Sequence, residues 1–180
     1  MMTRFALVAV VAVSLGVAAM SAQSKPSEGS PLVGKKVPAA ALKTFDGKST
    51  TLAAHLGKPT FVSFWASWCG PCLKEMPELN ALLTKHPGKF QVLAIAMGDK
   101  FTSAEPVMKA RAAFKFSWFI DADPAATMNT PLAKAFDIIA LPTAMWLAAD
   151  GTVVDYWRGL PPGEGELTKK VEALLDKSVR

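Results

Sequence analysis

The sequence predicts an α/β domain in which helices flank a central mixed β-sheet. Short apolar runs rich in β-branched and aromatic residues alternate with segments whose apolar residues have helical spacing, which is typical of parallel strands joined by helices. Two Asp-Gly pairs, Asp46-Gly47 and Asp150-Gly151, lie between strand-like segments and indicate β-hairpins. The domain is long enough to bury a core without additional disulfides.

The chain begins with a segment typical of export signals. Arg4 precedes an apolar run over residues 5–20, and small residues follow it. The run is short for a membrane span, which needs about 20 residues, and Ala19 and Ser21 suit a cleavage site. We therefore expect residues 1–22 to be a cleaved signal peptide, with an uncleaved membrane anchor as the alternative. Either outcome predicts a location in the periplasm, an oxidising compartment.

The next segment has the composition of a linker. Residues 23–35 are polar and contain Pro, Gly and Ser, so we expect a flexible linker there and a folded domain over residues 36–180. The formal net charge is +5. Because no basic stripe with interleaved aromatic residues is present, this charge does not indicate nucleic-acid binding. It favours solubility or an acidic partner surface instead.

The first half of the domain predicts a hairpin, a strand and a helix in that order. Residues 42–45 and 49–52 flank the first Asp-Gly turn and form the expected hairpin. The apolar run 60–66 has the length of a buried strand. A helix should begin near Cys69 and end at Pro87-Gly88. Its apolar positions have helical spacing and are Met76, Leu79, Leu82 and Leu83.

The second half predicts further strands and helices and ends in a hairpin and a helix. Because a helix intervenes, residues 90–96 should pair in parallel with the first buried strand through a right-handed crossover. We expect a helix over residues 105–114 with Ser103 as its N-cap, since serine accepts hydrogen bonds from a first turn. The remaining elements are predicted at residues 116–120 (strand), 132–136 (helix, capped by Thr130), 139–147 and 153–157 (hairpin) and 167–175 (helix).

Cys69 and Cys72 are the two cysteines of the chain, and they stand at the join between the predicted strand and helix. Two intervening residues on the first turn of a helix bring the sulfur atoms within bonding distance. Unpaired backbone N–H groups and the helix dipole stabilise an anion there, so the pKa of Cys69 should lie below its usual value of about 8.5. Cys69 is thus predicted to be the nucleophile, and Cys72, one turn deeper, the resolving thiol.

Two alternatives to a redox pair arise from the same residues. A structural disulfide that closes so short a loop would stabilise the fold by only about 2 kcal/mol. A zinc site would need His55 and His86 as further ligands, but the helix would place His86 roughly 20 Å from Cys72, whereas zinc bonds are about 2 Å. The spacing therefore favours thiol-disulfide exchange, which requires no metal or organic cofactor.

The segment Trp68-Cys69-Gly70-Pro71-Cys72, after a strand that ends in Phe64-Trp65-Ala66, resembles the active site of thioredoxin-fold proteins. The following segment Leu73-Lys74-Glu75-Met76-Pro77-Glu78-Leu79 and the Asp46-Gly47-Lys48 hairpin resemble more narrowly the TlpA/ResA group of exported thiol-disulfide oxidoreductases. The resemblance covers nearly the whole chain after the linker. It implies a thioredoxin-like fold with an added N-terminal β-hairpin.

The resemblance also implies roles for residues around the cysteines. Leu141-Pro142-Thr143 aligns with the loop that, in thioredoxin-like proteins, carries a cis-proline facing the CxxC pair and binds extended substrates. Relatives in the group place a carboxylate at the position of Glu75, near the buried cysteine, where it tunes thiol acidity and passes protons. Ser63 departs from cytoplasmic thioredoxins, which carry a buried Asp there, so Glu75 becomes the carboxylate expected near Cys72.

The remaining motif residues are expected to contact substrates and to set the redox poise. Trp68, Gly70 and Pro71 surround the nucleophile in sequence, and Gly-Pro is the dipeptide of thioredoxin itself. It favours a reduction potential nearer to about −270 mV than to the roughly −120 mV of DsbA. From the residues alone, Glu75 could instead be a solvated helix carboxylate and Trp68 a core residue.

The predicted function is the reduction of protein disulfides outside the cytoplasm by a monomeric enzyme. The resemblance implies a membrane electron donor of the DsbD/CcdA kind. It also implies substrates such as the haem-binding cysteines of apocytochrome c or thiols of copper-site assembly. One alternative is a thiol oxidase or isomerase, which a reduction potential above about −150 mV would indicate. Another is a non-catalytic module that binds a metal through its thiols.

Overall fold

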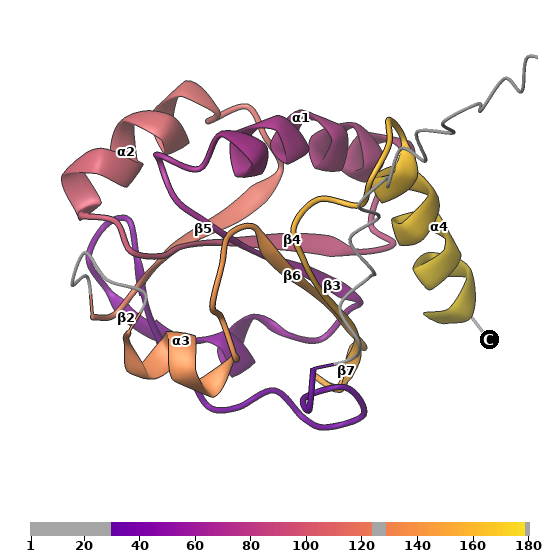
Figure 1. The fold of residues 1–180 in the computed structure, drawn as a ribbon, viewed down its shortest axis with the longest axis horizontal. Coiled ribbons are helices and arrows are strands. Elements are labelled where there is room, and N and C mark those ends of the chain that lie inside the picture. The colour runs from indigo at the N-terminus through magenta and orange to yellow at the C-terminus, as the bar shows by residue number, and fades with distance from the viewer. Residues whose placement is uncertain (1–29, 124–128, 179–180) are drawn as a thin grey trace, which may run out of the picture.

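The computed structural model describes residues 30–123 and 129–178. In this part of the chain a seven-stranded sheet, in the order β2-β1-β5-β4-β3-β6-β7, forms the centre, and helices lie on both of its faces (Figure 1). The elements in chain order are β1 (Ala41–Thr44), β2 (Ser49–Thr51), the 3-10 helix η1 (Leu52–His55), β3 (Thr60–Trp65), α1 (Gly70–Lys85), β4 (Gln91–Ala96), α2 (Phe101–Ala110), β5 (Phe116–Asp121), α3 (Pro131–Ala135), β6 (Thr143–Leu147), β7 (Val153–Arg158) and α4 (Glu166–Ser178).

The strand pairing confirms the mixed sheet predicted from the sequence. β3 pairs in parallel with β4, and β4 with β5, because α1 and then α2 carry the chain back before each next strand. β6 runs antiparallel to β3, and β7 antiparallel to β6 after the turn at Asp150-Gly151. The carboxyl ends of β3 and β4 and the amino end of β6 therefore meet at one edge of the sheet.

The early Asp-Gly turn produces the added hairpin. β1 and β2 pair antiparallel on either side of Gly47, whose φ of 83° is readily adopted only by glycine. β1 also pairs antiparallel with β5, with Leu42 opposite Asp121. The hairpin thus extends the sheet beyond β5. The fold is thioredoxin-like with an N-terminal β-hairpin, as predicted.

Two hydrophobic cores fill the two faces of the sheet, and β3 contributes alternate side chains to both. The face under α1 and α4 is filled by a core that includes Phe61, Trp65, Met76, Leu79 and Val171. The face under η1 and α3 is filled by a core that includes Leu52, Val62, Phe64, Leu132 and Phe136. Because β3 is buried along its whole length, it rigidly positions the segment that follows Trp65.

The second helix begins earlier than predicted. α2 covers Phe101–Ala110 with Lys100 at the N-cap, whereas the sequence indicated residues 105–114 with Ser103 as the cap. The backbone N–H of Ser103 donates to the carbonyl of Lys100 at 2.9 Å, so Ser103 already lies inside the first turn. No side chain caps this helix at Lys100. The cap signal used for the prediction is therefore not what starts α2.

The first described residues lie along the turn between β6 and β7. The N–H of Gly34 donates to the carbonyl of Val153, and the N–H of Val153 donates to the carbonyl of Lys35, each at 2.8 Å. Residues 30–35 were expected to belong to a flexible linker, and this backbone pairing fixes them to the domain instead. Leu32 also packs against the core on the face under η1 and α3, an apolar contact that the Pro, Gly and Ser of residues 23–35 obscured in the sequence.

The predicted signal peptide, residues 1–22, and residues 23–29 of the predicted linker lie outside the described residues. Among the residues that are described, none of the helices combines the length and the apolar character needed to cross a membrane. The expectation of export therefore rests on the sequence.

Candidate active site

Both cysteines lie at the start of α1, at the sheet edge where β3 and β4 end. Cys69 is the N-cap of the helix and Cys72 lies in its first turn, with their Cα atoms 5.3 Å apart and their sulfur atoms joined in a disulfide. Pro71 stands in the same turn, where its missing N–H leaves no helical hydrogen bond unmade. The predicted disulfide is confirmed. We call this end of the sheet the disulfide edge.

The helix start stabilises negative charge on one of the two sulfurs. The backbone N–H of Cys72 donates to the sulfur of Cys69 at 3.3 Å, as it would to a capping oxygen. After reduction, this N–H and the positive end of the helix dipole favour a thiolate at Cys69. Cys69 is 4% exposed and Cys72 is fully buried. This order of access matches a nucleophile followed by a resolving thiol.

A carboxylate that the sequence analysis did not single out holds the loop between β3 and α1. Asp99, just after β4, is buried and accepts hydrogen bonds from the backbone N–H and the hydroxyl of Ser67, the latter at 2.8 Å. The N–H of Met97 also donates to the carbonyl of Trp65 at 2.8 Å. These contacts fix residues 66–69 against the end of β4. The signal for Asp99 is its place directly after a parallel strand, at the edge where such sheets carry their sites.

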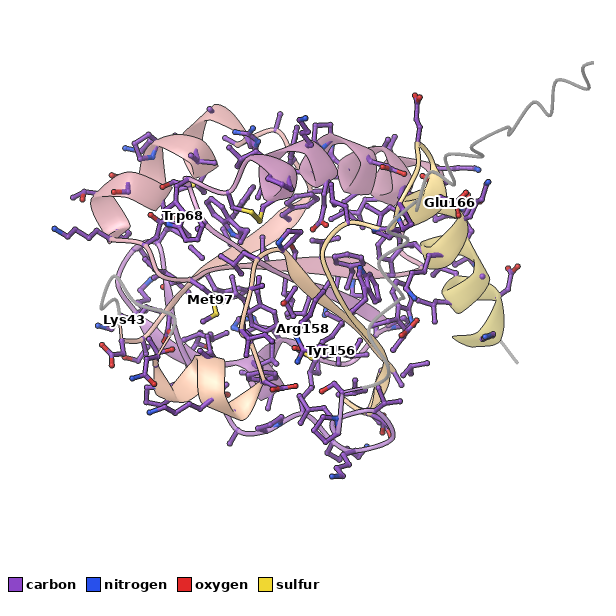
Figure 2. The ribbon with its side chains drawn as sticks, in the orientation of Figure 1. Lys43, Trp68, Met97, Tyr156, Arg158 and Glu166 are labelled. Carbon is purple, nitrogen blue, oxygen red and sulfur yellow. A yellow bond between two sulfur atoms is a disulfide. The ribbon has the colours of Figure 1, made fainter. Side chains whose placement is uncertain are left out.

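Trp68 lies on the surface beside the disulfide edge. Its side chain is 63% exposed, and its indole N–H donates to the carbonyl of Gly98 at 3.3 Å. Figure 2 labels this side chain near the amino end of α1. The alternative that Trp68 is a core residue is therefore wrong. The sequence motif instead places an exposed aromatic face next to Cys69.

Glu75 is a buried carboxyl one helical turn after Cys72. It is 2% exposed, and burial raises its pKa from 4.5 to about 7, although a hydrogen bond of 2.8 Å from the Ser63 hydroxyl favours the charged form. Its other oxygen, Oε2, is buried and has no hydrogen-bond partner among the described residues. Glu75 is therefore not a solvated helix carboxylate. The serine that departs from the thioredoxin pattern is its direct partner.

A groove of about 290 Å³ opens beside Glu75, between α1 and the segment that joins β7 to α4. It is lined by Lys74, Glu75, Glu78, Leu160, Pro161, Gly163, Glu164 and Leu167. Glu78 accepts hydrogen bonds from the N–H and the hydroxyl of Thr168, at 3.0 and 2.6 Å, which ties α1 to α4 at the groove. The groove brings solvent close to the buried carboxyl.

The Leu141–Pro142 peptide bond is cis, as the resemblance implied. Thr143, the first residue of β6, pairs with Phe64 near the end of β3, so Pro142 lies at the disulfide edge. The carbonyl of Pro142 accepts a hydrogen bond from the N–H of Gly159 at 2.8 Å. Leu141 is partly buried against the core that contains both cysteines. The structure therefore brings the predicted substrate loop and the cysteine pair to the same end of the sheet.

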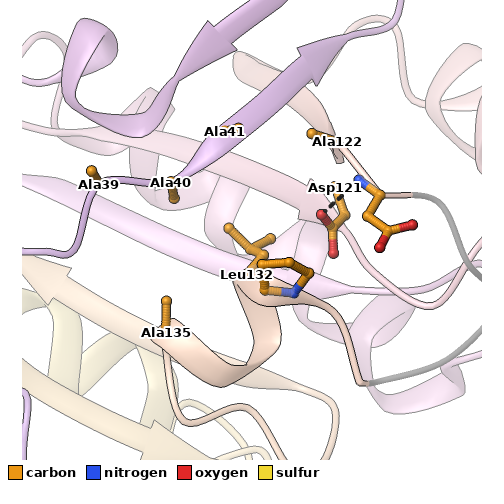
Figure 3. Close-up of a pocket in the computed structure, with 9 residues that line it drawn as sticks. Ala39, Ala40, Ala41, Asp121, Ala122, Leu132 and Ala135 are labelled. Carbon is orange, nitrogen blue, oxygen red and sulfur yellow. Dashed lines mark hydrogen bonds between the residues drawn. The ribbon is translucent and has the colours of Figure 1, made fainter.

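A second pocket lies between β1, the end of β5 and α3 (Figure 3). It measures about 140 Å³ and is lined largely by alanines. At its edge the Asp121 carboxyl accepts hydrogen bonds from the Thr130 hydroxyl and the Asp123 N–H, and burial raises the pKa of Asp121. Thr130 also caps α3 by accepting from the N–H of Ala133 at 3.1 Å. The polar groups at this pocket therefore anchor the start of α3.

The two histidines considered as zinc ligands have other partners. The ring of His55 lies 2.9 Å from the Thr50 hydroxyl and packs against Phe119 in a tilted arrangement, with ring centroids 4.5 Å apart. The ring of His86 lies 3.0 Å from the carboxylate of Glu172. Within the part of the chain that the structure describes, no three His, Cys, Asp or Glu side chains are grouped so as to hold a metal ion.

Known sequences support the chemistry that the cysteine pair indicates. The family model described as Redoxin matches residues 32–175. The thiol-disulfide oxidoreductase ResA from Bacillus thuringiensis subsp. konkukian is 30% identical over 128 residues, which cover 71% of this chain and 70% of ResA. The thioredoxin-like protein YneN from Bacillus subtilis is 31% identical over 144 residues, which cover 79% of this chain and 78% of YneN.

Solved structures share the architecture. A thiol-disulfide oxidoreductase from Bacteroides fragilis matches with a TM-score of 0.63 and 25% identity, over 78% of this chain and 99% of the other. StoA from Bacillus subtilis matches with a TM-score of 0.56 and 25% identity, over 78% of this chain and 98% of the other. Since the sequence match spans most of the chain and includes the cysteine pair at the helix start, the chain belongs to the Redoxin family and is a TlpA/ResA-like thiol-disulfide oxidoreductase with the thioredoxin fold.

Proposed function

We propose that the protein is an exported reductase of protein disulfides that acts through Cys69 and Cys72. The observation that carries the proposal is the placement of the pair at the start of α1, where Cys69 is the N-cap and 4% exposed and Cys72 is fully buried. A partner disulfide can reach the first sulfur while the second is kept for the intramolecular step. A disulfide that served only as a staple would need no such difference in access.

In the proposed reaction the Cys69 thiolate attacks one sulfur of the partner disulfide. The partner disulfide breaks, a mixed disulfide forms, and the first partner sulfur leaves as a thiolate that takes up a proton. Cys72 then loses its proton and attacks the Cys69 sulfur, which releases the second partner thiolate. Two electrons have passed from the dithiol to the partner, and the enzyme is left with the Cys69–Cys72 disulfide.

Glu75 is proposed to accept the proton that Cys72 loses. A carboxyl with a pKa of about 7 exists in both protonation states near neutral pH, so it can take a proton and return it. Its Oε2 atom has no competing partner among the described residues. The groove beside α1 offers the route by which the proton exchanges with solvent.

The partner is proposed to bind across the disulfide edge. Leu141-Pro142-Thr143 would pair with an extended segment of the partner through its backbone. Trp68 would cover that segment with its exposed indole. Apart from its two chain neighbours and the nearby backbone of α1, no atom of the described residues comes within 4 Å of the place where a Cβ on Gly70 would lie. Gly70 therefore leaves open space next to Cys69, and we propose that Gly70 and Pro71 contact the bound segment there.

The apolar run at the start of the chain supports export to the periplasm, either as a soluble protein after cleavage or anchored by residues 5–20. In an oxidising compartment the pair drifts to the disulfide, so each cycle needs a reductant. The resemblance to the TlpA/ResA group supports a membrane donor of the DsbD/CcdA kind. It also supports partners such as apocytochrome c or copper-site assembly proteins. We propose that the protein works as a monomer.

The test is to express Cys72→Ser in the native host and to identify the proteins that it traps. Without the resolving thiol the mixed disulfide persists, so we expect covalent complexes that dithiothreitol dissolves. Cys69→Ser is the matched control and should trap nothing. Failure of Cys72→Ser to capture any protein would contradict the exchange function.

Two further measurements decide the direction of the reaction and the class of function. We expect a reduction potential nearer to about −270 mV than to about −120 mV, and a value above about −150 mV would favour an oxidase or isomerase. Stoichiometric binding of Cu(I) or Zn without any disulfide reduction would instead identify a thiol metal-binding module.

A further inference from the structure

Residues 137–142 connect α3 to β6 and end in the cis-proline; we call them the cis-Pro loop. The loop lies at the disulfide edge and contains Ile139, whose side chain is 73% exposed. A polypeptide that lay along the cis-Pro loop would meet this side chain. How the loop is held in place bears directly on how a partner is recognised.

The first end of the cis-Pro loop is held by two side chains of β7. The hydroxyl of Tyr156 is hydrogen-bonded to the carbonyls of Asp137, at 2.8 Å, and Phe136, at 3.1 Å. Arg158 donates from Nη2 to the same Asp137 carbonyl at 2.9 Å and also to the Asp137 carboxylate. The guanidinium lies 5.0 Å from the centroid of the Tyr156 ring. The two side chains, labelled in Figure 2, thus form one unit, which we call the β7 clamp.

The backbone at Asp137 explains why donors are needed there. Its φ of 53° lies in the left-handed region, which non-glycine residues seldom adopt. It follows the last turn of α3, where backbone carbonyls have no partner within the helix. The hydroxyl and the guanidinium of the β7 clamp supply those partners. They hold the chain in the conformation from which the cis-Pro loop departs.

The second end of the cis-Pro loop is held by the same strand. Gly159, directly after β7, donates its N–H to the carbonyl of Pro142 at 2.8 Å. Arg158 lies opposite Thr143 in the pairing of β6 with β7. The hydroxyl of Thr143 donates to the carbonyl of Ala140 at 2.7 Å, which closes the loop on itself. Neighbouring residues of one strand therefore fix both ends of the loop.

Arg158 also carries one buried polar atom that its contacts leave unsatisfied. Its Nε atom is buried and has no hydrogen-bond partner in the described structure. A buried donor without a partner costs free energy. The hydrogen bonds that Arg158 does donate go to Asp137, at the start of the cis-Pro loop.

We propose that Tyr156 and Arg158 are positioning residues for the reaction with polypeptide disulfides. They act through the cis-Pro loop, whose backbone and Ile139 would lie along an extended segment of the partner. The inference rests on the proposed exchange function and adds a dependence on substrate size. A small disulfide that reaches Cys69 without lying along the loop does not need the clamp.

The test compares the pre-reduced full chain and its variants on two oxidised substrates, insulin and 2-hydroxyethyl disulfide, by stopped-flow kinetics. Tyr156→Phe and Arg158→Met each remove donors to the cis-Pro loop, and Arg158→Lys keeps the charge. Lys170→Met is the matched control. Lys170 makes the same kinds of contact with β7, an ion pair with Asp155 at 2.6 Å and a cation–π contact with Trp157 at 4.6 Å, without touching the loop.

We expect Tyr156→Phe and Arg158→Met to raise the insulin concentration needed for half-maximal rate by roughly tenfold. The rate constant with 2-hydroxyethyl disulfide should stay within about twofold, and the reduction potential of the cysteine pair should not move. Arg158→Lys should recover part of the loss, and Lys170→Met should match the wild type.

Three outcomes would overturn the inference while leaving the exchange function intact: equal losses on both substrates, a shifted reduction potential, or no loss with insulin. A wild-type protein that reduces neither disulfide would overturn both the inference and the function on which it rests.

Discussion

The hydroxyl of Ser63 in β3 donates a hydrogen bond of 2.8 Å to Oε1 of Glu75 in α1. A strand residue and a helix residue thus jointly set the proton affinity of the carboxyl that lies one turn beyond Cys72. Burial raises the pKa of Glu75, and the bond from Ser63 opposes that rise. The two effects can be separated by substitution.

Ser63→Ala should raise the pKa of Glu75 above its value of about 7, because it removes the donor that favours the charged form. The pH at which the rate of disulfide exchange changes should move upward with it. The measurement is the exchange rate of the reduced protein with 2-hydroxyethyl disulfide between pH 5 and pH 9. Ser117→Ala, an exposed serine of β5, is the control. A downward movement in Ser63→Ala would contradict the assigned bond.

Glu75 should also make the protein less stable as the pH rises. Between about pH 4.5 and pH 7 the folded protein holds a proton on Glu75 that the unfolded chain has lost, so the free energy of unfolding falls across this window and levels off above it. The cost at pH 8 is of the order of 3 kcal/mol. Glu75→Gln removes this dependence. Relative to the wild type, the variant should therefore stabilise the oxidised protein at pH 8 more than at pH 5. Urea unfolding of both proteins at the two pH values tests this, and a parallel pH dependence would argue against it.

Asp99→Ala should loosen the loop that carries Cys69. The substitution leaves the N–H and hydroxyl of Ser67 without their buried partner, and lost hydrogen bonds to a charged group cost about 2 kcal/mol. Urea unfolding of the oxidised protein gives the change. Asp46→Ala, at an exposed turn, should stay within about 0.5 kcal/mol. Equal stability of the two variants would show that Asp99 does not hold the loop.

Trp68→Ala should separate binding from stability. Because the side chain is 63% exposed, its loss should change the free energy of unfolding by no more than about 0.5 kcal/mol. The exchange rate with insulin should nevertheless fall by about tenfold, since the indole would no longer cover the bound segment. Val154→Ala, another exposed apolar residue, should leave both quantities unchanged. An unaltered exchange rate with insulin in Trp68→Ala would show that the indole does not contact the bound substrate.

The sequence anticipated those features that local chemistry encodes. The pair of cysteines two residues apart, the apolar run before it and the two Asp-Gly turns each carry a local conformational preference, and the corresponding disulfide, strand and hairpins are present. The cis state of Pro142 came from the resemblance, because the residue itself favours trans in most contexts.

Features that depend on partners distant in sequence were missed or misjudged. Asp99 bonds to the loop after β3, and its only signal in the sequence is its place directly after a strand. Arg158 bonds to Asp137 beyond the intervening β6, and that role has no local signature. The start of α2 at Lys100 has no side-chain cap, which left Ser103 as a misleading signal. Residues 30–35 have the composition of a linker, yet they are fixed by backbone pairing with Val153.

That pairing lies at the turn between β6 and β7, where β6 ends opposite the beginning of β3, whereas the cysteines follow the end of β3. Residues 34 and 35 and the two cysteines thus lie at opposite ends of the sheet. A segment that precedes Ser30 would join the domain at the end of the sheet opposite the disulfide edge, where partner proteins are proposed to bind. An anchor at residues 5–20, as proposed above, would therefore join the domain at the end of the sheet away from the disulfide edge.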